Sequence, residues 1–321
     1  MILVHISTSN GKIKKSSLEV LSHARSLASK AGLPLAAAVV DTDPARYTDE
    51  LASYGPAQIF TVADPLFAAH LNQPLIQALS QILSTAKPSV FACASTEATK
   101  DVLGALAASL GAAAIPDVSG FELIPGGVRA TRPVMAAKIL AETEAKADLV
   151  LVSVRSGSYD ATTAPSSPSV VPVSFQPGDI RIILKEILSS AGSQVDLNEA
   201  QVVVAAGRGI KDDDGKKLVE ELASVTGAAI GASRAVVETG MFPATAQIGQ
   251  TGKVVSPTLY FAIGISGAIQ HVAGMLNSKV IVAINKDADA PIFQYATYGL
   301  VGDLYKILPP LIAELKTVYG R

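Results

Sequence analysis

Five short segments in the second half of the chain combine glycine or a small hydroxyl residue with a charged or amide side chain. A phosphate, a ribose or the polar edge of a ring needs this combination, because backbone N–H groups, hydroxyls and a cation can all bind it. The five segments are residues 207–209, 233–234, 248–252, 266–271 and 285–287. Their composition therefore favours a binding site for a nucleotide-like ligand.

Of the five segments, GISGAIQH, residues 264–271, gives the clearest signal of a ligand-binding turn. We expect a strand to end at Gly264 and Ser266 to cap the following helix, whose first N–H groups would then face a pyrophosphate. A strand, a turn and a capped helix without any ligand is an equally good interpretation of this segment alone. In the first helical turn the dipole disfavours the charged form of His271, and a half-buried histidine bonded to backbone is the simpler role for it.

The other segments are less specific. Arg208 lies in a GRG turn that lacks the third glycine of GxGxxG, and no acidic residue ends a strand about 20 residues later, so the ordinary dinucleotide fingerprint is not met. Arg234 has the planar cation that stacks over a ring, although a surface ion pair is the alternative. Gln250, Thr251 and Asn285 are neutral donors and acceptors that also simply form turns.

Classical catalytic and metal-binding patterns are missing from the sequence. Residues 212–214 are three aspartates at a loop-to-helix junction, where they are better interpreted as helix caps than as metal ligands. One cysteine, Cys93, and four scattered histidines exclude an intrachain disulfide and disfavour zinc or iron–sulfur sites. We find no Ser/His/Asp arrangement and no paired catalytic carboxylates, and we expect no metal.

The elements that must position these segments follow a βα pattern in both halves, so the fold class expected is α/β. A mostly parallel N-terminal α/β domain is predicted over residues 1–193, and a doubly wound, Rossmann-like domain over 194–321. In the first half we predict strands at 1–7, 35–40, 89–94, 134–140 and 149–154 and helices at 17–31, 74–86, 100–110 and 181–189. In the second half we predict strands at 202–206, 229–232, 258–265 and 280–284 and helices at 215–226, 267–276 and 303–315. Doubly wound sheets bind ligands outside the carboxyl ends of their strands, where four of the five segments fall, while residues 248–252 form a polar loop flanked by glycine.

Composition narrows the class of protein. The chain has 321 residues, of which 49% are hydrophobic and 17% charged, so it has enough apolar residues for two folded domains. The formal net charge of -2 gives no electrostatic footprint for nucleic acid. The longest uncharged stretch, 254–278, is too interrupted for a membrane-spanning helix, and the first residues resemble a strand rather than an export signal. The proline-rich residues 155–178 are predicted to be a surface excursion.

Taken together, the motifs resemble one family, the alpha subunit of electron transfer flavoprotein. The resemblance rests on GASRAVVETG, QIGQTGKVVSPTLYFAIGISGAIQHVAGM, IVAINKDADAPIF and YGLVGDLYK, in this order from Gly231 onward. The first 190 residues resemble the family's N-terminal α/β domain mainly in layout. One departure is Thr297, where the family commonly has an acidic residue, and it puts a local contact near the adenosine side in doubt.

The resemblance implies that the C-terminal domain binds FAD. On the flavin side, the matching positions around the isoalloxazine ring and the ribityl chain are Ser233, Arg234, Ile248, Gly249, Gln250, Thr251 and His271. On the dinucleotide side, the matching positions are Arg208, the pyrophosphate turn Ser266, Gly267, Ala268, Ile269 and Gln270, and the adenosine residues Asn285, Asp303 and Leu304. The family places Thr251 at flavin N5 and His271 at the N1/C2 edge. A cation and a donor at that edge stabilise the negative charge of a reduced flavin, and pure electron transfer needs no catalytic base.

The resemblance also implies a role and partners. It predicts an electron carrier rather than a classical enzyme, in a heterodimer with a beta subunit. Electrons would come from flavin dehydrogenases such as acyl-CoA dehydrogenases, in fatty acid β-oxidation, and pass to a membrane quinone reductase. The expected location is the bacterial cytoplasm, or the mitochondrial matrix for a processed chain, without membrane insertion or nucleic acid. The alternatives are a bifurcating flavoprotein with a second FAD in the partner, an NAD-dependent dehydrogenase, and a non-redox module binding an adenine nucleotide in the first domain.

Overall fold

The computed structural model describes residues 1–69, 71–135, 139–182 and 197–319, and it divides into two compact units, Met1–Ser189 and Ser190–Arg321. We call these unit 1 and unit 2 and describe each by itself. The boundary predicted near residue 193 lies outside the described residues, as does most of the helix predicted at 181–189.

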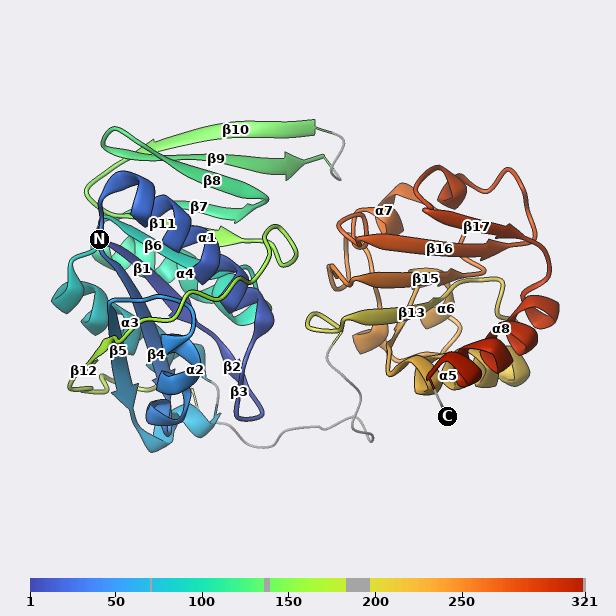
Figure 1. The fold of residues 1–321 in the computed structure, drawn as a ribbon, viewed down its shortest axis with the longest axis horizontal. Coiled ribbons are helices and arrows are strands. Elements are labelled where there is room, and N and C mark those ends of the chain that lie inside the picture. Colours follow the sequence, from blue (N-terminus) through green and yellow to red (C-terminus); the bar gives the residue numbers. More distant parts are fainter. Residues whose placement is uncertain (70, 136–138, 183–196, 320–321) are drawn as a thin grey trace. The chain divides into compact units, whose positions relative to one another are not determined.

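Unit 1 is built on a seven-stranded sheet in the order β12-β5-β4-β1-β6-β11-β7, in which every pairing is parallel (Figure 1). Its central strands are apolar runs such as ILVHI and VFACA, buried at every residue, as strands covered on both faces should be. The strands are β1 (Ile2–Ile6), β4 (Leu35–Asp41), β5 (Gln58–Ala63), β6 (Val90–Ala94), β7 (Ala113–Val118), β11 (Val150–Val154) and β12 (Ser169–Pro172).

Helices cover both faces of this sheet. The longest, α1 (Lys15–Ala31), packs Leu18 and Leu21 against one face and ends at Gly32, as predicted. On the opposite face lie α3 (Asn72–Ala86) and α4 (Glu97–Leu110). The α4 helix begins three residues before the predicted start, because Thr96 forms a capping box with Thr99. The short elements are α2 (Thr48–Ala52), the 3₁₀ helices η1 (Pro44–Tyr47) and η2 (Pro65–Ala69), and the hairpin strands β2 (Thr8–Ser9) and β3 (Lys12–Ile13).

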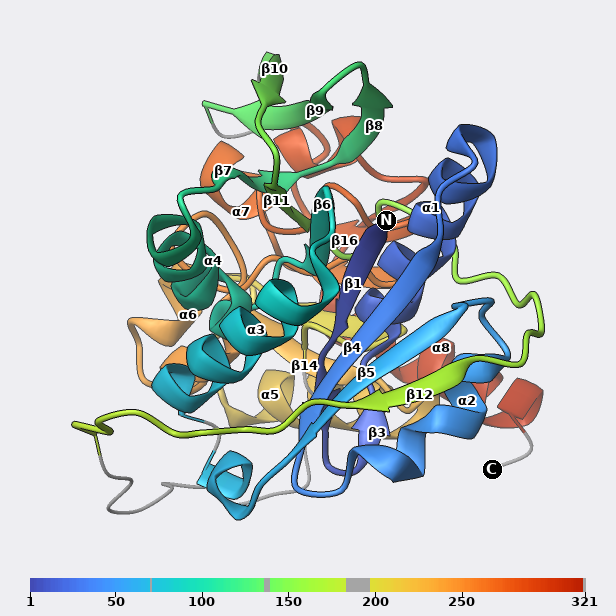
Figure 2. The same ribbon diagram turned by 90° about the vertical axis from the view of Figure 1, so that its left-hand side faces the viewer.

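One prediction about unit 1 is wrong, and another is incomplete. Residues 134–140 do not add a strand to the parallel sheet. Val134 ends β9 (Gly127–Val134), and Ile139 begins β10 (Ile139–Lys146). These two strands pair antiparallel, and β9 also pairs antiparallel with β8 (Gly120–Ile124). The predicted strand combines the end of one antiparallel strand with the start of the next, and Met135 already has a positive φ of 51°. The proline-rich segment is not only a surface excursion, since β12 pairs in parallel with β5 (Figure 2). Proline is tolerated there because β12 is an edge strand.

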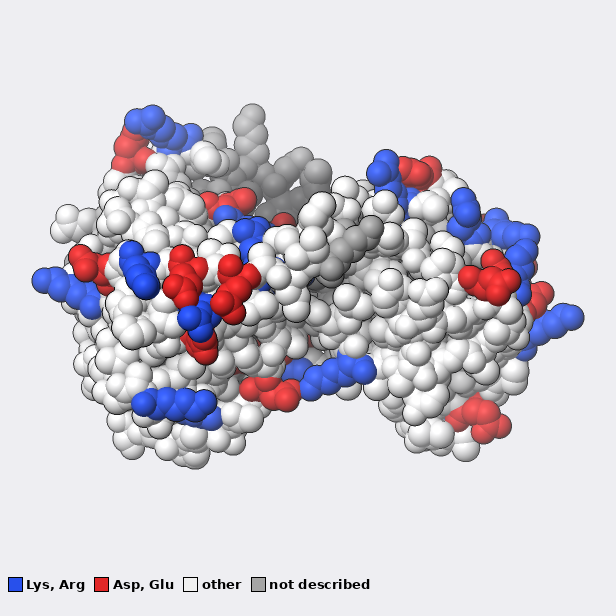
Figure 3. Space-filling model, turned by 90° about the horizontal axis from the view of Figure 1, so that it is seen from above, with Lys and Arg blue, Asp and Glu red and all other residues white. Residues whose placement is uncertain are grey.

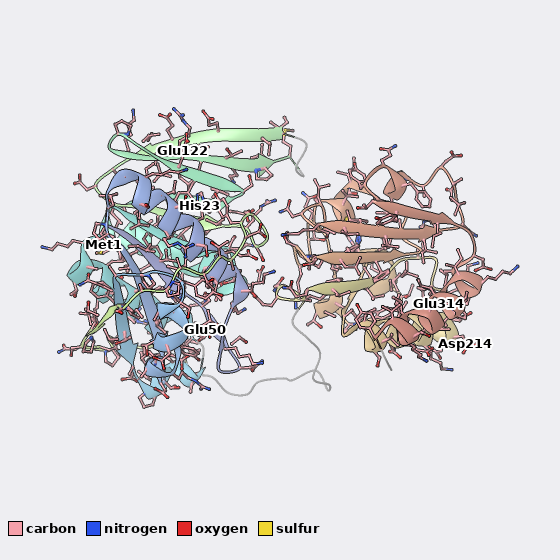
Figure 4. The ribbon with its side chains drawn as sticks, in the orientation of Figure 1. Met1, His23, Glu50, Glu122, Asp214 and Glu314 are labelled. Carbon is pink, nitrogen blue, oxygen red and sulfur yellow. The ribbon has the colours of Figure 1, made fainter. Side chains whose placement is uncertain are left out.

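The antiparallel sheet is tied to α1 by His23 (Figure 4). The His23 ring stacks on Tyr159 with centroids 3.7 Å apart, and its Nε2 lies 2.8 Å from the carbonyl oxygen of Phe121 on β8. On the outer side of this sheet, Arg129 bridges Glu122 and Glu144, so charges of both signs lie together. Figure 3 shows the same mixture of positive and negative side chains elsewhere on the face that it presents.

Unit 2 is a second parallel sheet, of five strands in the order β14-β13-β15-β16-β17. The strands are β13 (Val202–Ala206), β14 (Ala229–Ala232), β15 (Leu259–Ile263), β16 (Val280–Asn285) and β17 (Tyr298–Val301), of which β17 was not predicted. One face packs against α5 (Asp213–Thr226) and α8 (Leu304–Tyr319). Irregular segments that include Ile248, Val255 and Met275 cover the other. The remaining elements are α6 (Arg234–Val237), α7 (Ile269–Val272), η3 (Ala244–Ala246) and η4 (Pro291–Gln294).

The helix predicted over 267–276 is wrong in length, since α7 has only four residues. Gly274 lies so close to the 247–255 segment that a Cβ there would meet the backbone nitrogen of Gly249 at 2.4 Å. This tertiary contact, which helical periodicity does not reveal, accompanies the departure from the helix. By contrast, the aspartates at 212–214 behave as predicted, because the Asp212 carboxylate caps α5 by accepting from Gly215 N. In the part of the chain that the structure describes, no cluster of three or more possible metal ligands is found, and no helix is long and apolar enough to cross a membrane.

Two groups that titrate in water lie on neighbouring strands in the interior of unit 1. His5 on β1 lies opposite Cys93 on β6, and both side chains are almost completely buried. Burial raises the pKa of the Cys93 thiol to about 12, which keeps it protonated at neutral pH. Burial also lowers the pKa of the His5 imidazole from 6.5 to about 4, although a hydrogen bond with the Ala38 backbone acts in the opposite direction.

His5 should make unit 1 sensitive to acid. The unfolded chain takes up a proton near pH 6.5 and the folded chain does not, so stability present above pH 6.5 is lost as the pH falls toward 4. The loss attributable to His5 over this window is on the order of 3 kcal/mol. We expect His5→Leu to flatten the pH dependence of the urea unfolding midpoint between pH 8 and pH 5. Equal losses in the variant and the wild type would contradict the assignment.

Candidate functional site

A cavity of about 1220 Å³ lies in unit 2 where the strands of the parallel sheet end. Its lining comes from the segments that follow the strands: Arg208 after β13, Arg234 after β14, Ser266 after β15, Asn285 at the end of β16 and Asp303 after β17. The order 2-1-3-4-5 places the chain reversal between β13 and β15, and ligands of doubly wound folds bind at such a point.

Glycines let the loops after β13 and β15 meet at this point. A Cβ on Gly207 would lie 2.3 Å from the carbonyl oxygen of Gly264, so only glycine fits without movement of the backbone. Gly264 has a φ of 64°, in the left-handed region that favours glycine. The two loops are joined by Gly207 N to Ile263 O at 2.7 Å and by Gly209 N to Gly264 O at 3.0 Å.

A second wall is formed by residues 247–255, which lie against α7. Ile248 N donates to Ala232 O at 2.9 Å, which fixes this segment to the end of β14. Gln250 N then donates to Gln270 O at 2.7 Å, and Val255 N to Gly274 O at 2.8 Å. The wall therefore consists of backbone held by backbone, with the side chains of Gln250 and Thr251 among the groups lining the cavity.

His271 lies in α7 and contributes to the lining, although only 7% of it is exposed. Its Nδ1 lies 3.1 Å from the carbonyl oxygen of Ile248, and its Nε2 lies 2.8 Å from the hydroxyl of Tyr260. Burial lowers the pKa of the His271 imidazole to about 4, with the hydrogen bond to Ile248 opposing this shift. The pKa of His271 is therefore lowered, as its position in the helix predicted, but burial is the main cause of the shift.

Arg234 lines the cavity and also forms the surface ion pair that was the alternative interpretation. Its Nε donates to Glu238 Oε1 at 2.7 Å, within one helical turn, and both side chains are mostly exposed. Such an exposed pair contributes little to stability, so it leaves Arg234 available to a ligand at small cost. Arg208, Lys211 and Lys286 bring further positive charge to the lining, with Asp287 and Asp303 as the other acidic residues.

Two predicted site residues, Gly267 and Ile269, are not part of the lining. Gly267 has a φ of 86° and would place a Cβ 2.2 Å from Ile292 N, while Ile269 is 42% exposed. Ser266 lines the cavity but does not cap α7, whose N-cap is Ala268 without a side-chain bond. Instead the Ser266 carbonyl accepts from Ile292 N at 3.0 Å. These residues shape the turn through their backbone.

The structure brings the other predicted residues together around the cavity: Arg208, Ser233, Arg234, Ile248, Gly249, Gln250, Thr251, Ser266, Ala268, Gln270, His271, Asn285, Asp303 and Leu304. Sequence reasoning missed Lys211, Glu238, Gln247 and Tyr305, which also line it. Tyr305 directly follows Leu304, and its hydroxyl donates to Asp212 Oδ1 at 2.9 Å and accepts from Lys211 N at 3.2 Å. No sequence motif indicated these contacts. Thr297 does not line the cavity and pairs with the backbone of Ile281.

A parallel five-stranded sheet with a polar cavity at this point defines a doubly wound domain of the kind that binds nucleotides and flavins. Comparison with known proteins agrees: the family model described as "Electron transfer flavoprotein FAD-binding domain" matches residues 196–276, and the "Electron transfer flavoprotein domain" matches residues 2–176. The chain belongs to the electron transfer flavoprotein family, among its alpha subunits.

Individual relatives match over nearly their whole length. The alpha subunit of electron transfer flavoprotein from Mycobacterium tuberculosis strain H37Rv is 39% identical, over 99% of both chains. The corresponding subunit from Thermoanaerobacterium thermosaccharolyticum is 37% identical, over 96% of this chain and 95% of the relative. "Protein FixB" from Clostridium saccharobutylicum is 34% identical, over 96% of this chain and 94% of the relative. The chain is therefore a flavoprotein subunit that carries electrons rather than a classical enzyme, and its family implies a beta subunit as partner.

Proposed function

We propose that unit 2 binds FAD in the cavity and that the chain carries electrons as the alpha subunit of a heterodimer. The observation that carries this proposal is the convergence of five separate segments, all matched to FAD-contacting positions by sequence, on one cavity. The cavity volume of about 1220 Å³ suits a dinucleotide, since sites for smaller ligands usually occupy roughly 300–1,000 Å³.

The donor set of the cavity also suits FAD. Arg208, Lys211 and Lys286 offer positive charge for a pyrophosphate, and Asn285 and Asp303 offer polar groups for a ribose. We assign the adenosine half to Asn285, Asp303 and Leu304 and the pyrophosphate to the turn at 266–270. When bound, the flavin supplies the one-electron and two-electron chemistry that no side chain of the lining has.

We assign the isoalloxazine ring to the region of Arg234, Thr251 and His271. Arg234 would stabilise negative charge on the reduced ring, because a fixed cation is favourable where charge develops. The Thr251 hydroxyl, which accepts from Gln247 Nε2 at 3.0 Å, can donate to or accept from a ring nitrogen. Ser233 and Ile248 to Gln250 would shape the slot for the ring and the ribityl chain.

We propose that unit 1 packs against the beta subunit. Met135, Ile139 and Leu140, at the end of the antiparallel sheet, are exposed by 71%, 51% and 66%. Exposed apolar side chains of this kind are typical of interfaces with other proteins.

We further propose that electrons arrive from flavin dehydrogenases such as acyl-CoA dehydrogenases, in fatty acid β-oxidation, and leave to a membrane quinone reductase. The bacterial cytoplasm is the proposed location, in line with the bacterial origin of the relatives named above. In the bifurcating alternative a second FAD would lie in the beta subunit, so the number of flavins per heterodimer separates the two.

The test is a visible absorption spectrum of the chain purified with its coexpressed partner and followed through stepwise reduction. We expect a yellow protein whose flavin bleaches in steps and is identified as FAD after release. One FAD per heterodimer supports the simple carrier, and two support the bifurcating form. A colourless protein that FAD does not reconstitute would overturn the proposal, and a bound adenine nucleotide would then favour the non-redox module.

A further inference from the structure

Tyr260 on β15 does not line the cavity, but its hydroxyl bonds a residue that does. The side chain is fully buried in the core formed by residues such as Val203, Ile281 and Met275, and burial raises its pKa well above the ordinary value. The phenol is therefore a permanent hydroxyl at neutral pH. Its oxygen lies 2.8 Å from His271 Nε2.

The two hydrogen bonds of the His271 ring determine where its proton lies. The Ile248 carbonyl, 3.1 Å from Nδ1, can only accept a hydrogen bond, so Nδ1 must carry the proton. A neutral imidazole has one N–H group, which leaves a lone pair on Nε2. The Tyr260 hydroxyl must then donate to Nε2, and Tyr260, His271 and Ile248 form a single directed chain of hydrogen bonds.

The surroundings hold this chain in place. Ile248 is 1% exposed, and its own N–H donates to Ala232 O at 2.9 Å, so its carbonyl has a fixed position. His271 is anchored through its backbone N–H, which donates to Ala268 O at 2.9 Å. A buried acceptor without its donor is costly, so the Tyr260 hydroxyl stabilises the ring by donating to Nε2, while the Ile248 carbonyl determines which nitrogen is protonated.

We propose that Tyr260 is a positioning residue that holds the His271 ring by donating to Nε2, in the tautomer that the Ile248 carbonyl selects, with the proton on Nδ1 and the lone pair on Nε2. In this state His271 is a neutral cavity residue whose only N–H group is already bound to Ile248. A ligand that needs a donor from His271 must compete with the Ile248 carbonyl, and the fixed positive charge beside the ligand comes from Arg234. The inference concerns the chain's own groups, so it holds whether the ligand is FAD or another nucleotide.

The tautomer can be read directly by nuclear magnetic resonance of the full chain with its partner, labelled with ¹⁵N-histidine, at pH 7. Protonated and unprotonated ring nitrogens resonate far apart, and His271→Gln identifies the signals of His271. We expect a protonated Nδ1 and an unprotonated Nε2 in the wild type, both before and after FAD is added. A protonated Nε2 in the wild type would overturn the proposal without any variant.

Tyr260→Phe removes the hydroxyl and keeps the ring that fills the core. We expect the Nε2 signal of His271 to shift, because Nε2 loses its donor, while Nδ1 stays protonated against the Ile248 carbonyl. The matched control is Tyr305→Phe, which removes another phenol hydroxyl beside the cavity and should leave the His271 signals unchanged. If Tyr260→Phe leaves the signals of both ring nitrogens of His271 as they are in the wild type, the hydroxyl does not donate to Nε2 and the proposal is overturned. A protein that bound no flavin would overturn the proposed function but would leave this measurement intact.

Discussion

Replacing Arg234 with alanine is expected to lower the midpoint potential of the bound flavin by about 60 mV or more. A unit charge roughly 4 Å from the reduced ring is worth about 1 kcal/mol in water and about 4 kcal/mol at the effective dielectric constant of a protein surface. For a one-electron couple, about 1.4 kcal/mol corresponds to about 59 mV. The potential falls because the lost cation stabilises the reduced, negatively charged flavin more than the oxidised one. A redox titration of the purified heterodimer measures the shift.

Three variants give this prediction its controls. Arg234→Lys keeps the charge and should retain most of the potential. Lys211→Ala removes a cation from the part of the cavity beside Tyr305 and should change the potential less, since we assign that part to the dinucleotide. Glu238→Gln removes the carboxylate paired with Arg234 and should shift the potential upward. Equal potentials for Arg234→Ala and the wild type would show that the ring does not lie beside Arg234.

Gly267→Ala is expected to destabilise unit 2 by about 2–5 kcal/mol and to release the flavin. The left-handed backbone costs a non-glycine residue about 1–2 kcal/mol, and forcing an extra atom into a packed site costs a further 1–3 kcal/mol or so. Both costs apply, because Gly267 has a φ of 86° and its new Cβ would lie 2.2 Å from Ile292 N. The turn at Ser266 would then separate from the wall formed by Ala290 and Pro291.

Gly227→Ala is the matched control for this second prediction. Gly227 has a φ of 65°, but no atom lies within 4 Å of the position of a Cβ. Its substitution therefore costs only the free energy of placing alanine in a left-handed backbone conformation. Urea unfolding, monitored by the release of flavin, should therefore show a small loss of stability for Gly227→Ala and a much larger one for Gly267→Ala. Similar losses in the two variants would mean that the contact with Ile292 relaxes at no cost.

The sequence predicted the fold best where local and tertiary preferences agree. The strands at β1, β6, β11 and β13 are short apolar runs between turn residues, and a parallel sheet buries such runs on both faces. The cavity followed from the same pattern, because the ends of parallel strands meet at one edge. The family motifs selected most of its lining, including Arg234 and His271, before any geometry was known.

Two of the failures involve contact between residues far apart in the chain. Helical periodicity after Ser266 predicted a long helix, but α7 ends at Val272, close to where Gly274 approaches Gly249. Tyr305 was missed because its role depends on bonds to Asp212 and Lys211, more than 90 residues earlier. The Tyr260 contact with His271 was missed for a different reason: the two residues are only 11 apart in the chain, but a strand tyrosine resembles an ordinary core residue.

The buried thiol of Cys93 has a practical consequence for chemical labelling. The chain has one cysteine, it is 1% exposed, and its pKa of about 12 leaves almost no thiolate, the form that reacts with maleimides and iodoacetamides. A cysteine introduced at an exposed position, such as Ser109→Cys at the end of α4 or Lys316→Cys on α8, would be the reactive thiol of the native chain. A spin label or fluorophore can thus be attached to a chosen unit without first removing a native residue.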